Sequence, residues 1–185
     1  AGPGDGTASQ SHGPDPVTYS TTVSDPDDTA GRLDIAAVGH TIVVRRGRPT
    51  SVRYRIRTYS RFSDSDLDRR FRNLVIELDR DGEPGSELNV LVYSRHRQLR
   101  ADLISNATRE VIGHVDVDRL GPRLLRLRGP ADTIGARKYF WTSNYHHTGV
   151  HECGWYSGWP LTCQDTAPQR GWIRLDRPGW PSLDV

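Results

Sequence analysis

Short runs of β-forming residues, separated by turn residues, recur along most of this chain and restrict it to an all-β fold. The clearest run covers residues 51–59, where apolar or β-branched residues alternate with arginines: Val52, Tyr54, Ile56 and Thr58 against Arg53, Arg55 and Arg57. Successive side chains of a strand point to opposite faces, so this period of two predicts an antiparallel strand with one buried and one basic face.

Further runs of the same kind predict the remaining strands. They cover residues 41–46, 73–78, 88–93, 99–104, 111–117, 124–127, 139–142 and 172–175. The glycines and proline of residues 79–85 predict a hairpin turn, and the Asp-rich start of residues 63–71 predicts a single helical turn. We therefore expect an antiparallel, jelly-roll-like β-sandwich of about eight to ten strands.

Residues 1–30 differ from the rest of the chain because they are rich in Gly, Ser, Thr, Asp and Pro. Such a composition buries too little apolar surface to order itself, so we predict a flexible leader or linker at 1–30 and one β-sandwich domain at 31–185. The linker would lead to an upstream catalytic module, and the alternative is an arm held in place by residues 17–23. No apolar run approaches the ~20 residues of a membrane span, and we expect none.

The two cysteines, Cys153 and Cys163, have no C-x-x-C partner pair. This favours one structural disulfide over a zinc site, and a disulfide favours a secreted, extracellular protein. The Ala1 start of a chain without methionine is typical of a protein from which a signal peptide or a tag has been removed. The alternative is a pair of reduced thiols in a cytosolic protein.

Aromatic residues and histidines gather around these cysteines, and they predict a recognition loop. The residues are Trp155, Tyr156, Trp159, His146, His147 and His151. A disulfide would remove roughly 3 kcal/mol of unfolded-chain freedom and fix where the indoles point. Indole rings stack on the C–H faces of sugars and imidazoles bond to hydroxyl groups, so we expect the loop to bind an extracellular polysaccharide or cell-surface polymer. Trp141 and Trp172 lie inside predicted strands and are expected in the core.

Two other functions use different residues. His146, His147 and His151 could instead bind zinc or copper, which would make the chain a metal-binding protein or a metal-dependent extracellular enzyme. A structural or protein-interaction domain is the third alternative. The chain contains neither H-E-x-x-H nor G-x-S-x-G, no residue is assigned a catalytic role, and we expect a non-catalytic accessory domain.

Clustered aspartates predict a structural calcium ion, because calcium takes six to eight oxygen ligands. The candidates are Asp25, Asp27, Asp28, Asp79 and Asp81, with Asp34 close behind the first group. An EF-hand is excluded, since its twelfth position falls on Val90. Asx turns are the default interpretation of these aspartates, the calcium ion is the alternative, and no cofactor is required.

The basic face of residues 51–59 has two interpretations. Arg53, Arg55 and Arg57 could hold an anionic polymer through bidentate contacts, or cross-strand acids such as Glu77 and Asp79 could neutralise them. We favour neutralisation. The net charge is only +2 and the arginines are interleaved with acids, so we predict no nucleic-acid binding.

Three short patches carry a family resemblance. They are residues 25–28 with 33–35, residues 78–82, and residues 139–141 leading to 163–168. Together they resemble secreted β-sandwich domains of unassigned function common in actinobacteria, which are in turn similar to DOMON-type and carbohydrate-binding modules. The resemblance implies a β-sandwich fold and an extracellular location, and it assigns no site residues.

Overall fold

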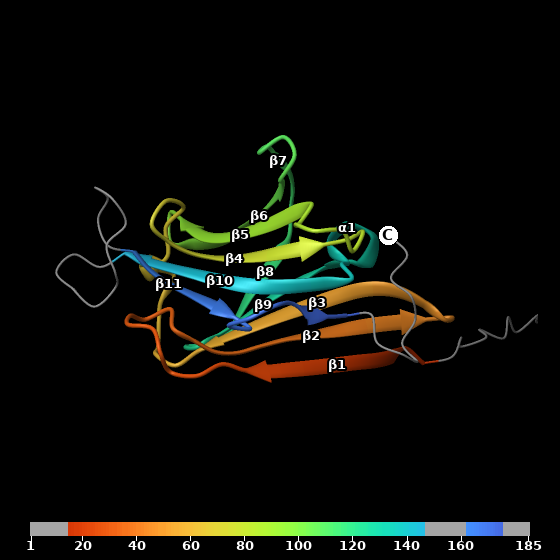
Figure 1. Cartoon of the computed structure of the whole chain (residues 1–185), viewed down its shortest axis with the longest axis horizontal. Coiled ribbons are helices and arrows are strands. Elements are labelled where there is room, and N and C mark those ends of the chain that lie inside the picture. Colours follow the sequence, from red (N-terminus) through yellow and green to blue (C-terminus); the bar gives the residue numbers. More distant parts are fainter. Residues whose placement is uncertain (1–14, 147–161, 176–185) are drawn as a thin grey trace, which may run out of the picture.

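The chain forms two antiparallel β-sheets with almost no helix, as the computed structural model shows (Figure 1). The structure describes residues 15–146 and 162–175. Its twelve strands are β1 (Val17–Ser24), β2 (Ile35–Arg45), β3 (Arg48–Thr58), β4 (Arg72–Asp79), β5 (Leu88–Arg95), β6 (Gln98–Ser105), β7 (Val111–His114), β8 (Asp116–Gly121), β9 (Leu124–Pro130), β10 (Lys138–His146), β11 (Thr162–Ala167) and β12 (Ile173–Arg174).

The strands divide into two sheets. Sheet 1 has the order β1-β2-β3-β9-β8, and sheet 2 has the order β11-β10-β4-β5-β6-β7, with β12 also paired to β10. Figure 1 shows β1, β2 and β3 as the lower part of the molecule and β4, β5 and β6 as the upper part. The predicted all-β, sandwich-like architecture is confirmed.

Strand β3 shows how the alternating sequence produces this arrangement. Val52, Tyr54 and Ile56 are at most 1% exposed, whereas Arg55 and Arg57 are exposed on the other side of the strand. The Tyr54 ring packs edge to face on Tyr139 of β10, with ring centroids 5.0 Å apart. The core therefore lies between the two sheets, as the period of two predicts.

The two tryptophans expected in the core have different environments. Trp141 is fully buried, as expected. Trp172 is only half-buried, and its ring packs on Phe140 with centroids 4.6 Å apart. The neighbouring Ile173 takes the inward position, and because adjacent residues of a strand alternate, Trp172 is directed to the outer face of sheet 2.

The sequence predicts a single strand at residues 111–117. The structure instead divides this segment between two strands, β7 and β8. Strand β7 pairs with β6 in sheet 2, and β8 pairs with β9 in sheet 1. The chain crosses between the sheets at Val115, whose N–H donates to the carbonyl of Ala101. This crossing, together with β1 and β11, brings the number of strands above the expected eight to ten.

Strand β1 lies inside the segment 1–30, for which the composition predicts a leader. All eight of its residues pair with β2, from Val17 opposite Val44 to Ser24 opposite Ala37. Strand β1 contributes little to the core, because its only apolar side chains that pack against the core are Tyr19 and Val23, and both are only partly buried. The sequence also allowed this segment to be an arm held in place by residues 17–23, and β1 covers those residues.

The expected neutralisation of the β3 arginines by Glu77 and Asp79 is wrong. Both acids lie on β4, in the opposite sheet. The cross-strand neighbours of Arg53 and Arg55 are themselves arginines, Arg128 and Arg126 of β9. The positions of these residues in the sequence do not indicate that β3 pairs with β9 in this register.

Helical structure in the described ranges consists of η1 (Asp64–Asp66) and α1 (Ala131–Ile134). The first lies within residues 63–71, where a helical turn is predicted, and a capping box involving Ser63 and Asp66 begins it. Across residues 15–146 and 162–175, no helix has the length and apolar character needed to cross a membrane.

Candidate metal centre

Two segments far apart in the sequence meet at one end of the sandwich. The loop 25–34, which joins β1 to β2, lies at the same end as the last residues of β10 and the first of β11 (Figure 1). Contact is close at Gly31, whose φ is +119°, because a Cβ there would lie 2.6 Å from the ring of Tyr145 on β10. Both the backbone angle and the missing side chain let the loop approach the strand.

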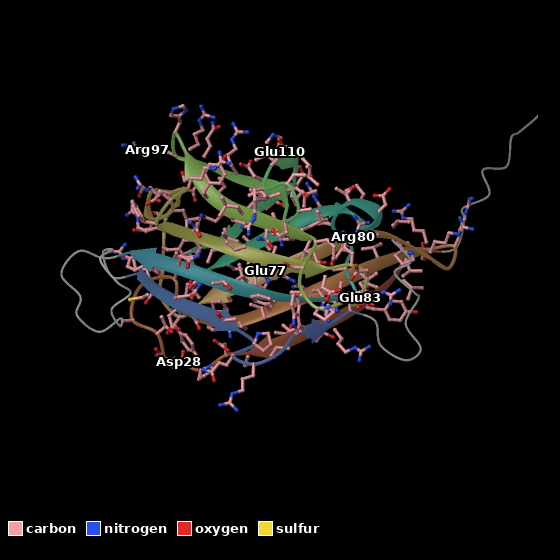
Figure 2. The ribbon with its side chains drawn as sticks, turned by 45° about the horizontal axis from the view of Figure 1, so that its top comes forward. Asp28, Glu77, Arg80, Glu83, Arg97 and Glu110 are labelled. Carbon is pink, nitrogen blue, oxygen red and sulfur yellow. The ribbon has the colours of Figure 1, made fainter. Side chains whose placement is uncertain are left out.

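Aspartates from both segments form one cluster, which we call the aspartate centre: Asp25, Asp27, Asp28, Asp34 and Asp165. One carboxylate oxygen each from Asp25, Asp28 and Asp165 lie within 4.8 Å of one another. The carboxyl of Asp34 interacts with those of Asp27 and Asp165. Figure 2 labels Asp28 beside the blue strand β11. The centre thus joins the β1–β2 loop to sheet 2.

Three of the five aspartates are buried. Asp25, Asp34 and Asp165 are 3–4% exposed, whereas Asp28 is exposed. Asp25 Oδ2 and Asp34 Oδ1 are inaccessible to water and have no hydrogen-bond donor among residues 15–146 and 162–175. A buried carboxylate oxygen without a partner is strongly unfavourable, so these two atoms indicate that a positively charged ligand belongs here.

Backbone hydrogen bonds hold the centre in place. The N–H of Ile35 donates to Asp165 Oδ2 at 2.6 Å, although the two residues are 130 positions apart. Tyr59 binds both ends of the loop, since its hydroxyl donates to the Asp25 carbonyl at 2.6 Å and its N–H donates to the Asp34 carbonyl at 2.9 Å. The Asp165 carboxylate and the backbone of the loop at Asp25 and Asp34 are therefore held in place.

The buried carboxyl groups of the aspartate centre have raised pKa values, because they are removed from water and lie close to one another. Burial, together with the negative charges of Asp165 and Asp28, raises the pKa of Asp25 to about 7. Burial and the contacts with Asp27 and Asp165 raise the pKa of Asp34 to about 7 as well. Burial also raises the pKa of Asp165. The ion pairs found between described residues include none of these five aspartates.

These groups could hold a hard divalent cation. Calcium binds oxygen ligands at about 2.3–2.6 Å, so two oxygens on one ion lie up to about 5 Å apart, which matches the spacing of Asp25, Asp28 and Asp165. Zinc prefers histidine and cysteine, and all five groups here are carboxylates. Calcium also tolerates irregular geometry better than magnesium does, which favours calcium among hard cations.

The structure separates the predicted aspartates into two clusters. Asp79 and Asp81 lie with Glu87 in the β4–β5 hairpin, away from Asp25, Asp27 and Asp28. Lys138 Nζ lies 2.8 Å from Asp79 Oδ2, and the Gly82 N–H donates to Asp79 Oδ1 at 2.6 Å. Because Lys138 already neutralises the charge of Asp79, this hairpin is a weaker candidate than the aspartate centre, where no cation of the described residues does so.

The predicted recognition loop lies outside the described residues. This applies to Trp155, Tyr156, Trp159, His147, His151 and Cys153, and to the side chain of His146. The backbone of His146 ends β10, opposite Thr162 at the start of β11. Cys163 is buried opposite Tyr145 on β10. Residues 147–161 therefore join two paired strands.

Sequence reasoning missed one member of the centre. Asp34 stands near the Asp25–Asp28 group in the sequence, but Asp165 carries no local signal, since it is a single acid between Gln164 and Thr166. Only the pairing of β11 with β10 brings it to the loop.

Compared with protein-family models, curated proteins and solved structures, the chain gives no significant match.

Proposed function

We propose that this chain is a secreted, non-catalytic binding module that takes a calcium ion at the aspartate centre and recognises an extracellular polysaccharide. The observation that carries the proposal is the pair of buried, unpartnered carboxylate oxygens, Asp25 Oδ2 and Asp34 Oδ1. A calcium ion would supply the positive charge that both atoms lack. Calcium sites of extracellular modules typically have a Kd of about 10⁻⁴–10⁻³ M, which is the range we expect for this site in a secreted protein.

The calcium ion would act on stability and on the position of the loop 25–34, because its ligands come from that loop and from β11. At roughly 100 times its Kd, a ligand that binds only the folded state adds about 2.7 kcal/mol to the free energy of unfolding. For a chain of this length we expect Tm to rise by roughly 5–10 °C when calcium replaces a chelator.

The test compares two single substitutions by thermal unfolding and calcium titration. Asp34→Asn removes one charge from the centre while keeping the shape of the side chain, so it should raise Tm in chelator and abolish the rise on adding calcium. Asp81→Asn, in the β4–β5 hairpin, is the matched control and should keep the wild-type response. An Asp34→Asn protein that still responds fully to calcium would exclude the centre as the site.

Polysaccharide recognition is proposed for the aromatic loop. One feature supports it: the strands on either side of residues 147–161 pair up to His146 and Thr162. Trp155, Tyr156 and Trp159 would stack on sugar rings, and His146, His147 and His151 would bind hydroxyl groups. A Cys153–Cys163 disulfide would fix the loop, and the buried position of Cys163 beside β10 supports it.

Retention on insoluble polysaccharides tests this part of the proposal. We expect the Trp155→Ala/Trp159→Ala double variant to lose at least about tenfold in affinity, because stacking on an aromatic ring contributes on the order of 1 kcal/mol per contact. Its Tm and calcium response should remain those of the wild type. Unchanged retention of the double variant would remove the aromatic loop from the proposal.

A further inference from the structure

Five arginines lie together on the outer side of sheet 1, on the central strands β3 and β9. We call this surface the arginine face: Arg53, Arg55, Arg57, Arg126 and Arg128. Arg53 lies directly opposite Arg128 and Arg55 directly opposite Arg126 in the β3–β9 register. The adjacent Val52, Tyr54 and Leu127 point into the core, so the arginines point away from it.

The arginine face is only partly neutralised. On β8, Asp118 pairs with Arg126 at 2.7 Å, and Asp116 lies 3.4 Å from Arg128. Arg53, Arg55 and Arg57 form no ion pair with any acid in residues 15–146 or 162–175. The face therefore carries an excess of three positive charges.

This arrangement opposes folding, which indicates that it serves another purpose. Like charges directly opposite each other in a sheet are destabilising, and here two such pairs are adjacent. In addition, Arg53 Nε is inaccessible to water and has no hydrogen-bond partner. An anion on this face would relieve the repulsion, because a guanidinium binds carboxylate and sulfate groups through two parallel hydrogen bonds.

The surroundings of the face favour a sugar polymer over other polyanions. Hydroxyl side chains lie on the β1 and β2 side: Ser20 Oγ bonds to Thr41 Oγ1 at 2.8 Å, and Arg55 donates to the same Thr41 oxygen at 3.0 Å. Ser20 is exposed and can bind a sugar hydroxyl, whereas Thr41 is buried and orients Ser20 and Arg55. Within β1, β2, β3, β9 and β8 the outward positions carry no aromatic ring on which a nucleic-acid base could stack. Tyr59, directly after β3, is 37% exposed, and its hydroxyl is bound to the Asp25 carbonyl.

The dimensions also fit a single extended chain. Arg53, Arg55 and Arg57 alternate along β3 at about 7 Å intervals, and the two strands lie about 4.8 Å apart. The basic area is thus long and two strands wide, with acids on one border and hydroxyl groups on the other.

We propose that the arginine face binds a linear acidic polysaccharide, with its carboxylate or sulfate groups on Arg53, Arg55, Arg57, Arg126 and Arg128. This inference rests on the proposed polysaccharide-binding function and names the chemical class of polymer and a second surface for it. The arginine face would select for negative charge.

The experiment measures retention of the full chain on immobilised dextran sulfate, polygalacturonate and neutral dextran. Arg55→Gln/Arg57→Gln removes two exposed, unpaired members of the face. Arg97→Gln/Arg100→Gln removes the same charge from the β5–β6 hairpin and is the matched control. We expect the first variant to bind at least about tenfold more weakly to one or both acidic polymers, with an unchanged or higher Tm, and the control to bind like the wild type.

Three results would overturn the inference. They are equal binding by the wild type and the Arg55→Gln/Arg57→Gln variant, equal losses in both double variants, and tighter binding of a single-stranded oligonucleotide than of either acidic polysaccharide. Comparing dextran sulfate with polygalacturonate shows whether sulfate or carboxylate is preferred. The calcium response and the effect of Trp155→Ala/Trp159→Ala are measured separately, so a failure here is distinguishable from a failure of the proposed function.

Discussion

Individual carboxylates decide the chemistry of the aspartate centre. Asp25, Asp34 and Asp165 are buried among like charges, and no arginine in the described part of the chain pairs with them as Arg119 and Arg126 pair with Asp64 and Asp118. Two ligands can relieve the repulsion in such a group, a proton or a metal ion. The two ligands should therefore compete, and the balance between them should depend on pH.

We predict that, in chelator, the protein loses stability as the pH rises from about 4 to about 7. Asp25 and Asp34 have a pKa of about 7 in the folded state against 3.8 for an ordinary aspartate. Over that range the folded state holds protons that the unfolded state has released, so the free energy of unfolding falls with rising pH and levels off above about pH 7.

Urea denaturation in chelator at several pH values between about 5 and 8 measures this slope. Saturating calcium should remove most of it, and Asp34→Asn should reduce it even without calcium. A free energy of unfolding that rises with pH across this interval in chelator would contradict the assignment of raised pKa values to these groups.

At the scale of elements, strand β1 is held mainly by its backbone. Its hydrophobic contribution is small, and the strand lies at the edge of sheet 1. Close approach to β2 depends on Gly39, since a Cβ at this position would lie 2.5 Å from the Thr21 carbonyl oxygen. Gly39 also stands opposite Arg55 in β3, so it lies between the edge strand and the arginine face.

We predict that Gly39→Ala destabilises the protein by about 1–3 kcal/mol, because the added methyl group forces β1 away from β2. Hydrogen exchange should be faster at the amides of residues 17–24 than in the wild type. Gly121→Ala in β8 is the control, since no neighbouring atom lies within 4 Å of its new Cβ, and it should change stability little. Equal effects of the two substitutions would show that the close contact at Gly39 is not the cause.

For the molecule as a whole, the aspartate centre connects the two sheets. Asp25 follows a strand of sheet 1, Asp165 lies within a strand of sheet 2, and the Ile35 N–H bond to Asp165 crosses between them. A calcium ion here would hold the sheets together at the end from which β10 and β11 lead into residues 147–161. In this way one ion could stabilise the sandwich and fix the base of the proposed recognition loop.

The sequence by itself determined the local structure. Alternation in residues 51–59 predicts β3 and its buried face, and the glycines of residues 79–85 predict the hairpin, because both patterns depend only on how neighbouring residues project from the backbone. The aspartates of residues 25–28 likewise predict a negatively charged loop.

Only the tertiary structure decided which strands are neighbours, and both proposed sites depend on that. Asp165 joins the aspartate centre through the β10–β11 pairing, and Arg126 and Arg128 come to lie opposite Arg55 and Arg53 rather than acids of β4. Polar strands such as β1 and β11 have no apolar pattern to mark them, and they form because main-chain hydrogen bonding to an already buried neighbour does not depend on side-chain identity. Strand register across the two sheets is a long-range property, set by how the whole core packs, and no local pattern in the sequence encodes it.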